Sequence, residues 1–241
     1  MKSLKIVPLI VFCVYLQGKA FSQTNSIKYP MSWELQLGSN YLTNNNLSKN
    51  HPYQNIKSIS GNFYSYVDFQ KKSFILRPGI GMSSQNFGLN KMIVVNGDKT
   101  EFQNFSSNSN YQYSYLQKMF IEIPVGFIYT TQNNKKQRYF EYEIGVKFGY
   151  LIYSESQYLL KISPKEYTVF TEKNLPQLNP FQFGTYIKFS SRKIQLNRTL
   201  GISFSISSQY NFSEVFEYGN NTPTQSYSFM LGMGFFINKM I

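Results

Sequence analysis

The chain has 241 residues with a formal net charge of +12, and 15% of its residues are charged while 18% are aromatic. Soluble domains carry roughly 25% charged residues, and the basic residues here concentrate in short turns rather than on one face, which argues against a nucleic-acid-binding module. The single cysteine, Cys13, lies near the amino terminus, so we expect neither disulfides nor a thiolate metal site in the rest of the chain. No later stretch approaches 18 apolar residues, which excludes a transmembrane helix.

The first 22 residues have the organisation of a secretory signal peptide. Lys2 and Lys5 precede the apolar run IVPLIVFCVYL, and Ala20-Phe21-Ser22 offers a small-x-small cleavage site. Cys13 does not fit a lipoprotein site, because Phe12 stands where a small residue is needed. Residues 1–22 hold three lysines and no acidic residue, so the net charge of the mature chain is +9. We therefore expect one exported domain at 23–241.

Period-2 alternation of apolar and polar residues marks the strands of this domain. The clearest cases are YFEYEIGVKFGYLI from Tyr139, LGISFSISSQYNF from Leu200 and YSFMLGMGFFI from Tyr227. A strand with one apolar face crosses a bilayer in about 9 to 11 tilted residues, and closure into a barrel satisfies every backbone group. We predict eight strands, at 33–42, 58–70, 73–86, 116–130, 138–153, 180–191, 197–211 and 225–238. The predicted fold class is all-β: an eight-stranded antiparallel up-and-down transmembrane β-barrel.

The connections between these strands alternate between short and long. Short turns fall at Lys71–Lys72, Thr131–Gln137 and around Arg192, whereas long loops span about 43–57, 87–115, 154–179 and 212–224. Outer-membrane barrels have an even strand number, short periplasmic turns and longer external loops. This alternation predicts that both termini are periplasmic and that four loops lie outside the cell.

A soluble lipocalin-like barrel is the rival architecture, because it also alternates but turns its apolar face inward. Such a barrel would carry many lysines and glutamates on its outer face. Here the polar face holds mainly Gly, Ser and Gln, which suit a lumen barely wide enough for side chains. Aromatic residues near the strand ends suit the interfacial girdles of a membrane barrel, namely Tyr41, Tyr129, Phe181 and Tyr210.

The polar face, turned inward, gathers most of the ionisable residues of the strands. It comprises five acids and three bases: Glu34, Asp68, Arg77, Glu122, Glu141, Glu143, Lys147 and Lys188. Charges crowded away from bulk water must pair or lose their charge. The first interpretation is a network of ion pairs and hydrogen bonds that fills the lumen. The alternative interpretations are a proton or ion path, or acid–base work by Glu141 and Glu143.

Catalytic and metal-binding patterns are weak in this sequence. Barrel enzymes of this size commonly use a histidine beside a serine or aspartate, and here the single histidine, His51, lies in the first long loop with Ser48 nearby. A lone loop histidine is usually a solvated surface residue and does not build a metal site unaided. We expect no catalytic residue, no cofactor and no metal.

Three segments resemble a known family. YLQKMFIEIPVGFIY, from Tyr115 to Tyr129, resembles the YLEIP-type strand of the PorT-like outer-membrane β-barrel proteins of the Bacteroidota, and LRPGIGMS, from Leu76, is similar to their preceding Pro-Gly strand. The closing SFMLGMGFFI is similar to their last strand. The resemblance spans essentially the whole mature chain and implies an eight-stranded outer-membrane barrel without implying an activity. The carboxyl terminus FFINKMI departs from the usual terminal aromatic, and Phe235 or Phe236 is a candidate replacement in the signal that insertion machinery reads.

The functional expectation is a non-enzymatic barrel with a structural or surface-interaction role, or an accessory of envelope or protein-secretion machinery. Its expected partners are outer-membrane lipids, the barrel-insertion machinery, and an envelope or surface protein contacted through loops 87–115 and 154–179, since long loops often carry function. For Tyr111, Tyr113 and Tyr115 the alternative is that they extend the fourth strand above the membrane. A narrow pore and a lipid-modifying enzyme are the alternative functions.

Overall fold

The computed structural model describes eleven segments of the chain and the isolated residue Val215. The segments are 31–42, 59–71, 74–89, 91–96, 99–104, 111–132, 138–163, 166–175, 178–195, 200–213 and 225–237. Within them the regular structure is entirely β. No helix in these segments is long and apolar enough to cross a membrane.

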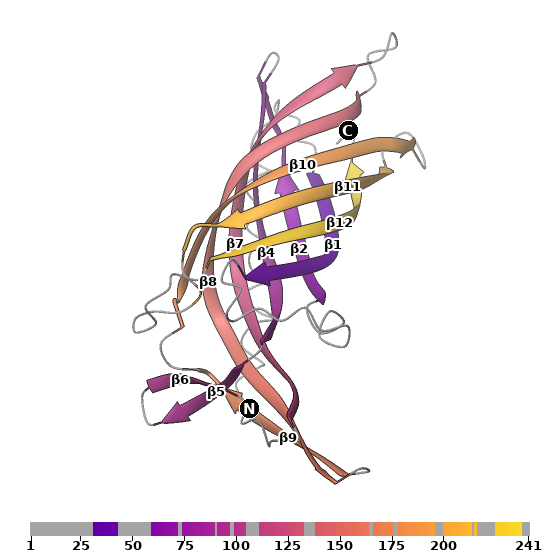
Figure 1. Cartoon of the computed structure of the whole chain (residues 1–241). Coiled ribbons are helices and arrows are strands. Elements are labelled where there is room, and N and C mark those ends of the chain that lie inside the picture. The colour runs from indigo at the N-terminus through magenta and orange to yellow at the C-terminus, as the bar shows by residue number, and fades with distance from the viewer. Residues whose placement is uncertain are drawn as a thin grey trace.

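Eight of the twelve strands in the described segments close into an antiparallel barrel (Figure 1). They are β1 (Met31–Leu42), β2 (Ile59–Val67), β4 (Phe74–Leu89), β7 (Tyr111–Gln132), β8 (Arg138–Ser163), β10 (Phe181–Gln195), β11 (Leu200–Asn211) and β12 (Ser226–Ile237). Sequence neighbours pair around the ring. β1 pairs with β12, and β8 pairs with β10 from Phe140↔Ser191 to Tyr150↔Phe181, which closes it. The predicted fold, an eight-stranded antiparallel barrel, is confirmed.

Each predicted strand falls on one barrel strand, because the period-2 pattern continues only where both faces of the barrel wall constrain the side chains. The second predicted strand divides into β2 and a three-residue β3 (Phe69–Lys71), which also pairs with β4. Asp68 lies at this interruption between β2 and β3.

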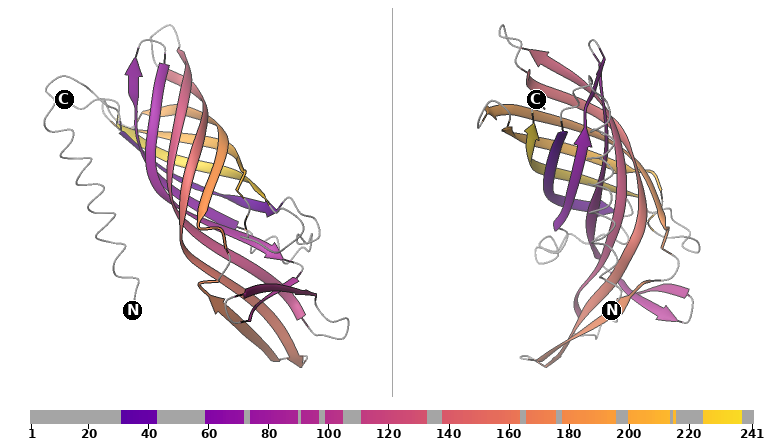
Figure 2. Two further views of the ribbon diagram at one scale, coloured as in Figure 1. Left: turned by 90° about the vertical axis from the view of Figure 1, so that its left-hand side faces the viewer. Right: turned by 180° about the vertical axis from the view of Figure 1, so that it is seen from behind.

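The segments predicted as loops 87–115 and 154–179 contain more strand than expected. β7 begins at Tyr111 and β8 continues to Ser163, so both run well past the barrel, where β8 pairs with β9 (Glu166–Lys173). β5 (Lys91–Asn96) and β6 (Lys99–Asn104) form a separate hairpin beside this extension. Both views in Figure 2 show the extension and the hairpin at the same end of the barrel. The prediction of loops was wrong there, since these segments form hairpins that pair with their own sequence neighbours.

The start of β7 at Tyr111 bears out the interpretation that the tyrosine-rich stretch extends the fourth barrel strand. Tyr115 pairs with Gln157 of β8 and Gly88 of β4, so this stretch belongs to the wall of the extended end. We refer to this end of the barrel as the long end and to the opposite end, where Met31 and Ile237 lie, as the short end.

Candidate functional site

The lumen of the barrel holds the densest group of ionisable side chains in the described segments. All eight residues assigned to the lumen from the sequence point inward, and each is at most 7% exposed. They come from β1, β4, β7, β8 and β10 and from the β2–β3 interruption. Neighbouring strands place their inward residues at matched registers, for example Glu143 of β8 opposite Lys188 of β10.

Arg77 lies at the centre of the larger ion-pair cluster. Its guanidinium binds Asp68 in a bidentate manner, with Nε 2.6 Å from Oδ1 and Nη2 2.9 Å from Oδ2. The same group donates to Glu141 Oε2 at 3.0 Å and to Glu143 Oε2 at 3.1 Å. A planar guanidinium has five N–H donors in fixed directions, so it can bind several carboxylates at once. The ammonium of a lysine has three donors on a flexible stem and fixes the geometry of its partners less well.

Lys188 connects this cluster to the far wall of the barrel. Its Nζ lies 2.9 Å from Glu143 Oε2 and 2.9 Å from Glu34 Oε2. The ring of Tyr66 lies below both cations, 4.5 Å from Lys188 Nζ and 5.8 Å from Arg77 Cζ. An aromatic face stabilises a desolvated cation, so Tyr66 offsets part of the cost of burying two positive charges side by side.

A second cluster surrounds Glu122. Lys147 Nζ lies 3.3 Å from Glu122 Oε1 and donates to Gln209 Oε1 at 2.5 Å. The hydroxyl of Tyr64 donates to Glu122 Oε2. Gln182 Nε2 donates to Glu122 Oε1 at 3.4 Å. Each carboxylate oxygen of Glu122 therefore has a donor.

Gln36 joins the two clusters. Its amide donates to Glu34 Oε1 at 3.2 Å, and its carbonyl accepts from Gln209 Nε2 at 3.3 Å and from Asn62 Nδ2 at 3.2 Å. The contacts of the lumen thus form one connected network from Asp68 to Asn211, with Gln182 donating to Asn211 Oδ1 at 2.7 Å. A network in which buried donors meet buried acceptors rigidifies the interior of a narrow barrel.

Glycines make the space that the network needs. Gly126 and Gly145 lie opposite each other on β7 and β8, and Tyr186 of β10 packs against both. A Cβ at Gly145 would lie 2.6 Å from Cζ of Tyr186, so only glycine leaves room for the ring. Tyr186 in turn donates to Glu143 Oε1 at 2.6 Å. The two glycines, which have no side chain, thereby leave room in the lumen for one hydrogen-bonding aromatic residue.

Three inward tyrosines, Tyr64, Tyr66 and Tyr186, escaped the sequence-based assignment. The segment FYSYVDF carries aromatic residues on both faces, which hid the inward direction. The alternation of side chains along a strand could have identified them. Tyr64 and Tyr66 lie an even number of residues from Asp68, and Tyr186 lies two residues from Lys188, so they share the inward face of those residues. An inward charged residue therefore also marks its neighbours at i−2 and i−4.

The network leaves little free volume. The space between Tyr64, Tyr66, Lys147 and Tyr186 amounts to about 10 Å³, which is room for about one water molecule. Among the described residues, no group of three or more His, Cys, Asp or Glu side chains is arranged to hold a metal ion. His51 and Ser48, the candidates weighed for catalysis, lie outside the described residues, as do residues 1–22.

The outer face of the barrel is the chemical opposite of its lumen. Each of the eight barrel strands exposes large apolar or aromatic side chains, for example Leu231 of β12 at 58% and Ile187 of β10 at 65%. Of the residues assigned to aromatic girdles, Tyr41, Tyr129 and Phe181 are exposed, while Tyr210 is half-buried with its ring 5.2 Å from that of Phe212. On β4 and β7 the outward face toward the long end includes polar residues, and Gln117 Nε2 donates to Ser84 Oγ at 3.1 Å.

Comparison with known proteins gives distant structural similarities alone. No family model and no curated protein matches the sequence. Three solved structures are similar, each with 10% sequence identity: Neisserial surface protein A (TM-score 0.39, 88% of this chain and 97% of that chain), the outer membrane protease OmpT from Escherichia coli (0.38, 90% and 99%), and Ail, the attachment invasion locus protein of Yersinia pestis, in complex with a heparin analogue (0.37, 87% and 99%). At these identities and scores the similarities assign neither a family nor an activity to this chain.

Proposed function

We propose that this protein is a non-enzymatic outer-membrane β-barrel with a structural or surface-interaction role. The observation that supports it is the inverted distribution of polarity, with ion pairs in the lumen and apolar side chains on the outer wall of all eight strands. Exposure of contiguous apolar surface to water is costly, and monomeric soluble proteins rarely have such patches above a few hundred Å². Hydrocarbon as the surrounding solvent removes that cost, and the closed barrel meets its requirement that all backbone groups be paired.

The proposed orientation places the short end in the periplasm and the long end outside the cell. The long end carries the β5–β6 hairpin and the β8–β9 extension, where Tyr158 stacks on Phe170 with ring centroids 4.9 Å apart. Val169 and Phe170 are exposed on that extension. Exposed aromatic and apolar residues on a rigid hairpin suit contact with another protein of the envelope or cell surface. This role includes service as an accessory of envelope or protein-secretion machinery.

A non-catalytic role is favoured by the ion pairs that the lumen carboxylates form. Asp68, Glu122, Glu141 and Glu143 are each held by a cation inside the wall, so none is presented to a substrate in an external cleft. The filled space around Tyr64 and Tyr186 disfavours the second candidate, a narrow pore. The network therefore fits a plug that stabilises the barrel.

Membrane insertion is tested by extraction and electrophoresis. The purified protein should stay in the membrane fraction after carbonate washing and should migrate faster on a gel when unboiled than when heated, because a closed barrel resists detergent unfolding. Identical migration together with recovery in the soluble fraction would contradict the proposal.

Orientation is tested by cysteine labelling, since residues 23–241 contain no cysteine. Lys173→Cys, at the exposed end of β9, should react with a membrane-impermeant maleimide on intact cells. Asn134→Cys, in the predicted turn from Thr131 to Gln137, is the matched control and should react only after the outer membrane is permeabilised. The opposite result would reverse the proposed topology. Crosslinking from Lys173→Cys in the native membrane then identifies the partner.

A further inference from the structure

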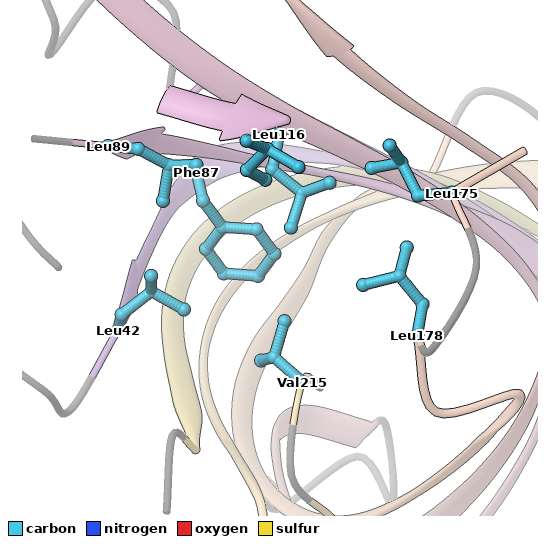
Figure 3. Packing of buried hydrophobic residues seen from close by; sticks show 8 residues of the cluster. Leu42, Phe87, Leu89, Leu116, Leu175, Leu178 and Val215 are labelled. Carbon is cyan, nitrogen blue, oxygen red and sulfur yellow. The ribbon is translucent and has the colours of Figure 1, made fainter. Parts of the chain in front are cut away.

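The mouth of the barrel at the long end is closed by an apolar cluster that contains no ion pair. Its members are 0–5% exposed and are Leu42, Phe87, Leu89, Ile93, Leu116, Leu175, Leu178 and Val215. Figure 3 shows that these side chains converge across the opening from different sides of the ring. Leu42, Phe87, Leu89 and Leu116 belong to the wall strands β1, β4 and β7, whereas Leu175, Leu178 and Val215 lie outside any strand of the barrel.

The filling residues that the structure describes follow β9 in one case and β11 in the other. After β9, the amide of Asn174, whose φ is 52°, donates to Ser154 O at 2.8 Å, and the amide of Leu175 donates to Ser154 Oγ at 2.9 Å. After β11, the carbonyl of Val215 accepts from Asn179 N at 3.4 Å. We call Leu175, Leu178 and Val215 the lid residues. They lie outside the continuous hydrogen-bond ladders of the barrel wall, and connecting segments of this kind open at lower free energy than the strands beneath.

Lys118 lies directly beneath the lid. Its side chain is 4% exposed, and its Nζ lies 3.4 Å from Val215 O and 4.9 Å from the centre of the Phe120 ring. Within the described residues no carboxylate lies within ion-pair distance of it, in contrast to Arg77, Lys147 and Lys188. The residues opposite Lys118 in the register are neutral, namely Gln85 of β4 and Ser154 of β8.

The position of Lys118 relative to the apolar outer wall matters for its charge. Its outward neighbours on β4 and β7 are Ser84, Asn86, Gln117 and Met119, of which three are polar, so it lies at the outer edge of the apolar band. Burial without a counter-charge lowers the pKa of Lys118 from 10.5 to about 7. An anion bound to this amine would stabilise its protonated form and supply a counter-charge.

We propose that the mouth is a binding site for a single-chain carboxylate amphiphile, whose carboxylate pairs with Lys118 and whose alkyl chain replaces the lid residues against Leu42, Phe87 and Leu116. The wall residues supply an apolar pocket that Leu175 and Leu178 occupy in the closed state. A flexible alkyl chain can replace these two side chains, because it makes the same apolar contacts. The single cation at the base selects an anionic head group. The width of an eight-stranded barrel admits one chain rather than the two of a phospholipid.

The test uses the full mature protein in nanodiscs of zwitterionic lipid. A palmitate analogue with a terminal diazirine is photo-crosslinked, the modified peptides are mapped, and unlabelled competitors are titrated. We expect crosslinks at the mouth, on the segments around Leu116 and Leu175, and competition by palmitate. Hexadecanol should compete at least tenfold less well, and hexadecyltrimethylammonium should not compete at the mouth. Crosslinks confined to outward residues of the wall, or equal competition by the cationic amphiphile, would overturn the proposal.

Variants separate the head-group contact from the apolar pocket. Lys118→Met should weaken competition by palmitate at least tenfold and leave that by hexadecanol unchanged, while Lys118→Arg should retain most of the palmitate binding. The pair Leu175→Ser and Leu178→Ser should strengthen palmitate binding several-fold, because the lid then competes less well for the pocket. Heat-modifiable migration verifies that each variant is folded. Equal palmitate competition in wild type and a folded Lys118→Met variant would contradict the assignment of Lys118.

Discussion

Arg77 neutralises more carboxylates than any other cation described in the lumen. It is 3% exposed and contacts three carboxylates, those of Asp68, Glu141 and Glu143. A buried ion pair adds little net stability compared with apolar residues of similar volume, yet removal of one partner leaves an uncompensated buried charge. The stability of the barrel should therefore depend strongly on this one side chain.

Arg77→Met should lower the free energy of unfolding by about 3–5 kcal/mol, the range typical of a broken buried pair. Urea unfolding of the protein refolded into detergent micelles measures it. The matched variant Arg77→Met with Asp68→Asn should recover part of the loss, since it removes one of the stranded charges. A loss below about 1 kcal/mol for the single variant would place Arg77 in contact with water instead.

Lys118 gives a pH-dependent prediction, and here removal of the buried charge should stabilise the protein rather than destabilise it. Because its pKa is about 7 in the folded protein and 10.5 ordinarily, the unfolded chain binds more protons between these values, and wild-type stability rises with pH across that window. Below pH 7 the penalty for burying the charge is fully present. Lys118→Met removes that penalty, so it should be the more stable protein at pH 7, by on the order of 1.4 kcal/mol per pKa unit of the shift.

The check is the difference in urea midpoint between wild type and Lys118→Met from pH 6.5 to 10. The difference should be largest at the acid end and shrink as the pH rises. Lys118→Arg, which stays charged throughout, serves as the control and should show no such convergence. A constant difference across the range would contradict burial of an unpaired amine.

At the level of single strands, the outward and inward faces of β12 have opposite requirements. Its outward residues run from Tyr227 through Leu231 to Phe235 and are all exposed, whereas Ser226, Ser228 and Met230 are buried. Exposed aromatic residues lie toward both ends of this face, and Tyr227 stacks on Tyr41 at 5.1 Å. Leu231 lies midway between them, at the expected level of the bilayer centre.

Leu231→Arg should destabilise the folded barrel by about 2–4 kcal/mol in liposomes, the cost of a cation on the lipid face near the midplane. Gln117→Arg, an outward position on β7 at the outer edge of the apolar band, is the matched control and should change stability by less than about 1 kcal/mol. Refolding yield and urea midpoints in liposomes measure both. Equal tolerance of the two substitutions would contradict a lipid-facing outer wall.

Sequence alternation predicted the strands well and the connections poorly. β10, β11 and β12 lie within a few residues of their predicted bounds, because alternation there is enforced by an apolar exterior and a crowded lumen. β5, β6, β9 and the outer part of β8 were assigned to loops. Those strands leave the barrel, so neither face is held to a single polarity and the periodic signal disappears.

For the molecule as a whole, the lumen is obstructed at two levels. The ion-pair network around Arg77, Lys188 and Lys147 fills the middle of the barrel, and the apolar cluster fills the long end. The two obstructions use different chemistry and are built from different segments. Opening of the lid alone would therefore not create a passage.

Planar-bilayer recording should find the wild-type protein silent after verified insertion. The pair Leu175→Ser and Leu178→Ser should remain silent as well, because Tyr64 and Tyr186 still block the lumen beneath. Addition of Tyr64→Ala and Tyr186→Ala to the lid variant should produce small unitary currents through the enlarged cavity. Currents from the wild type or from the lid variant alone would favour the narrow pore instead.

The sequence by itself determined which segments form the wall of the barrel, which face of each is apolar, and which eight ionisable residues lie on the polar face, because all three follow from a local period of two. The tertiary structure decided how those residues pair. Arg77 meets Glu143 across 66 positions and Lys188 meets Glu34 across 154, which depends on the register and closure of the barrel. It also decided that Leu175, Leu178 and Val215 cover the mouth above Lys118. Residues in connecting segments have no periodicity to direct them, so only the folded chain brings them together.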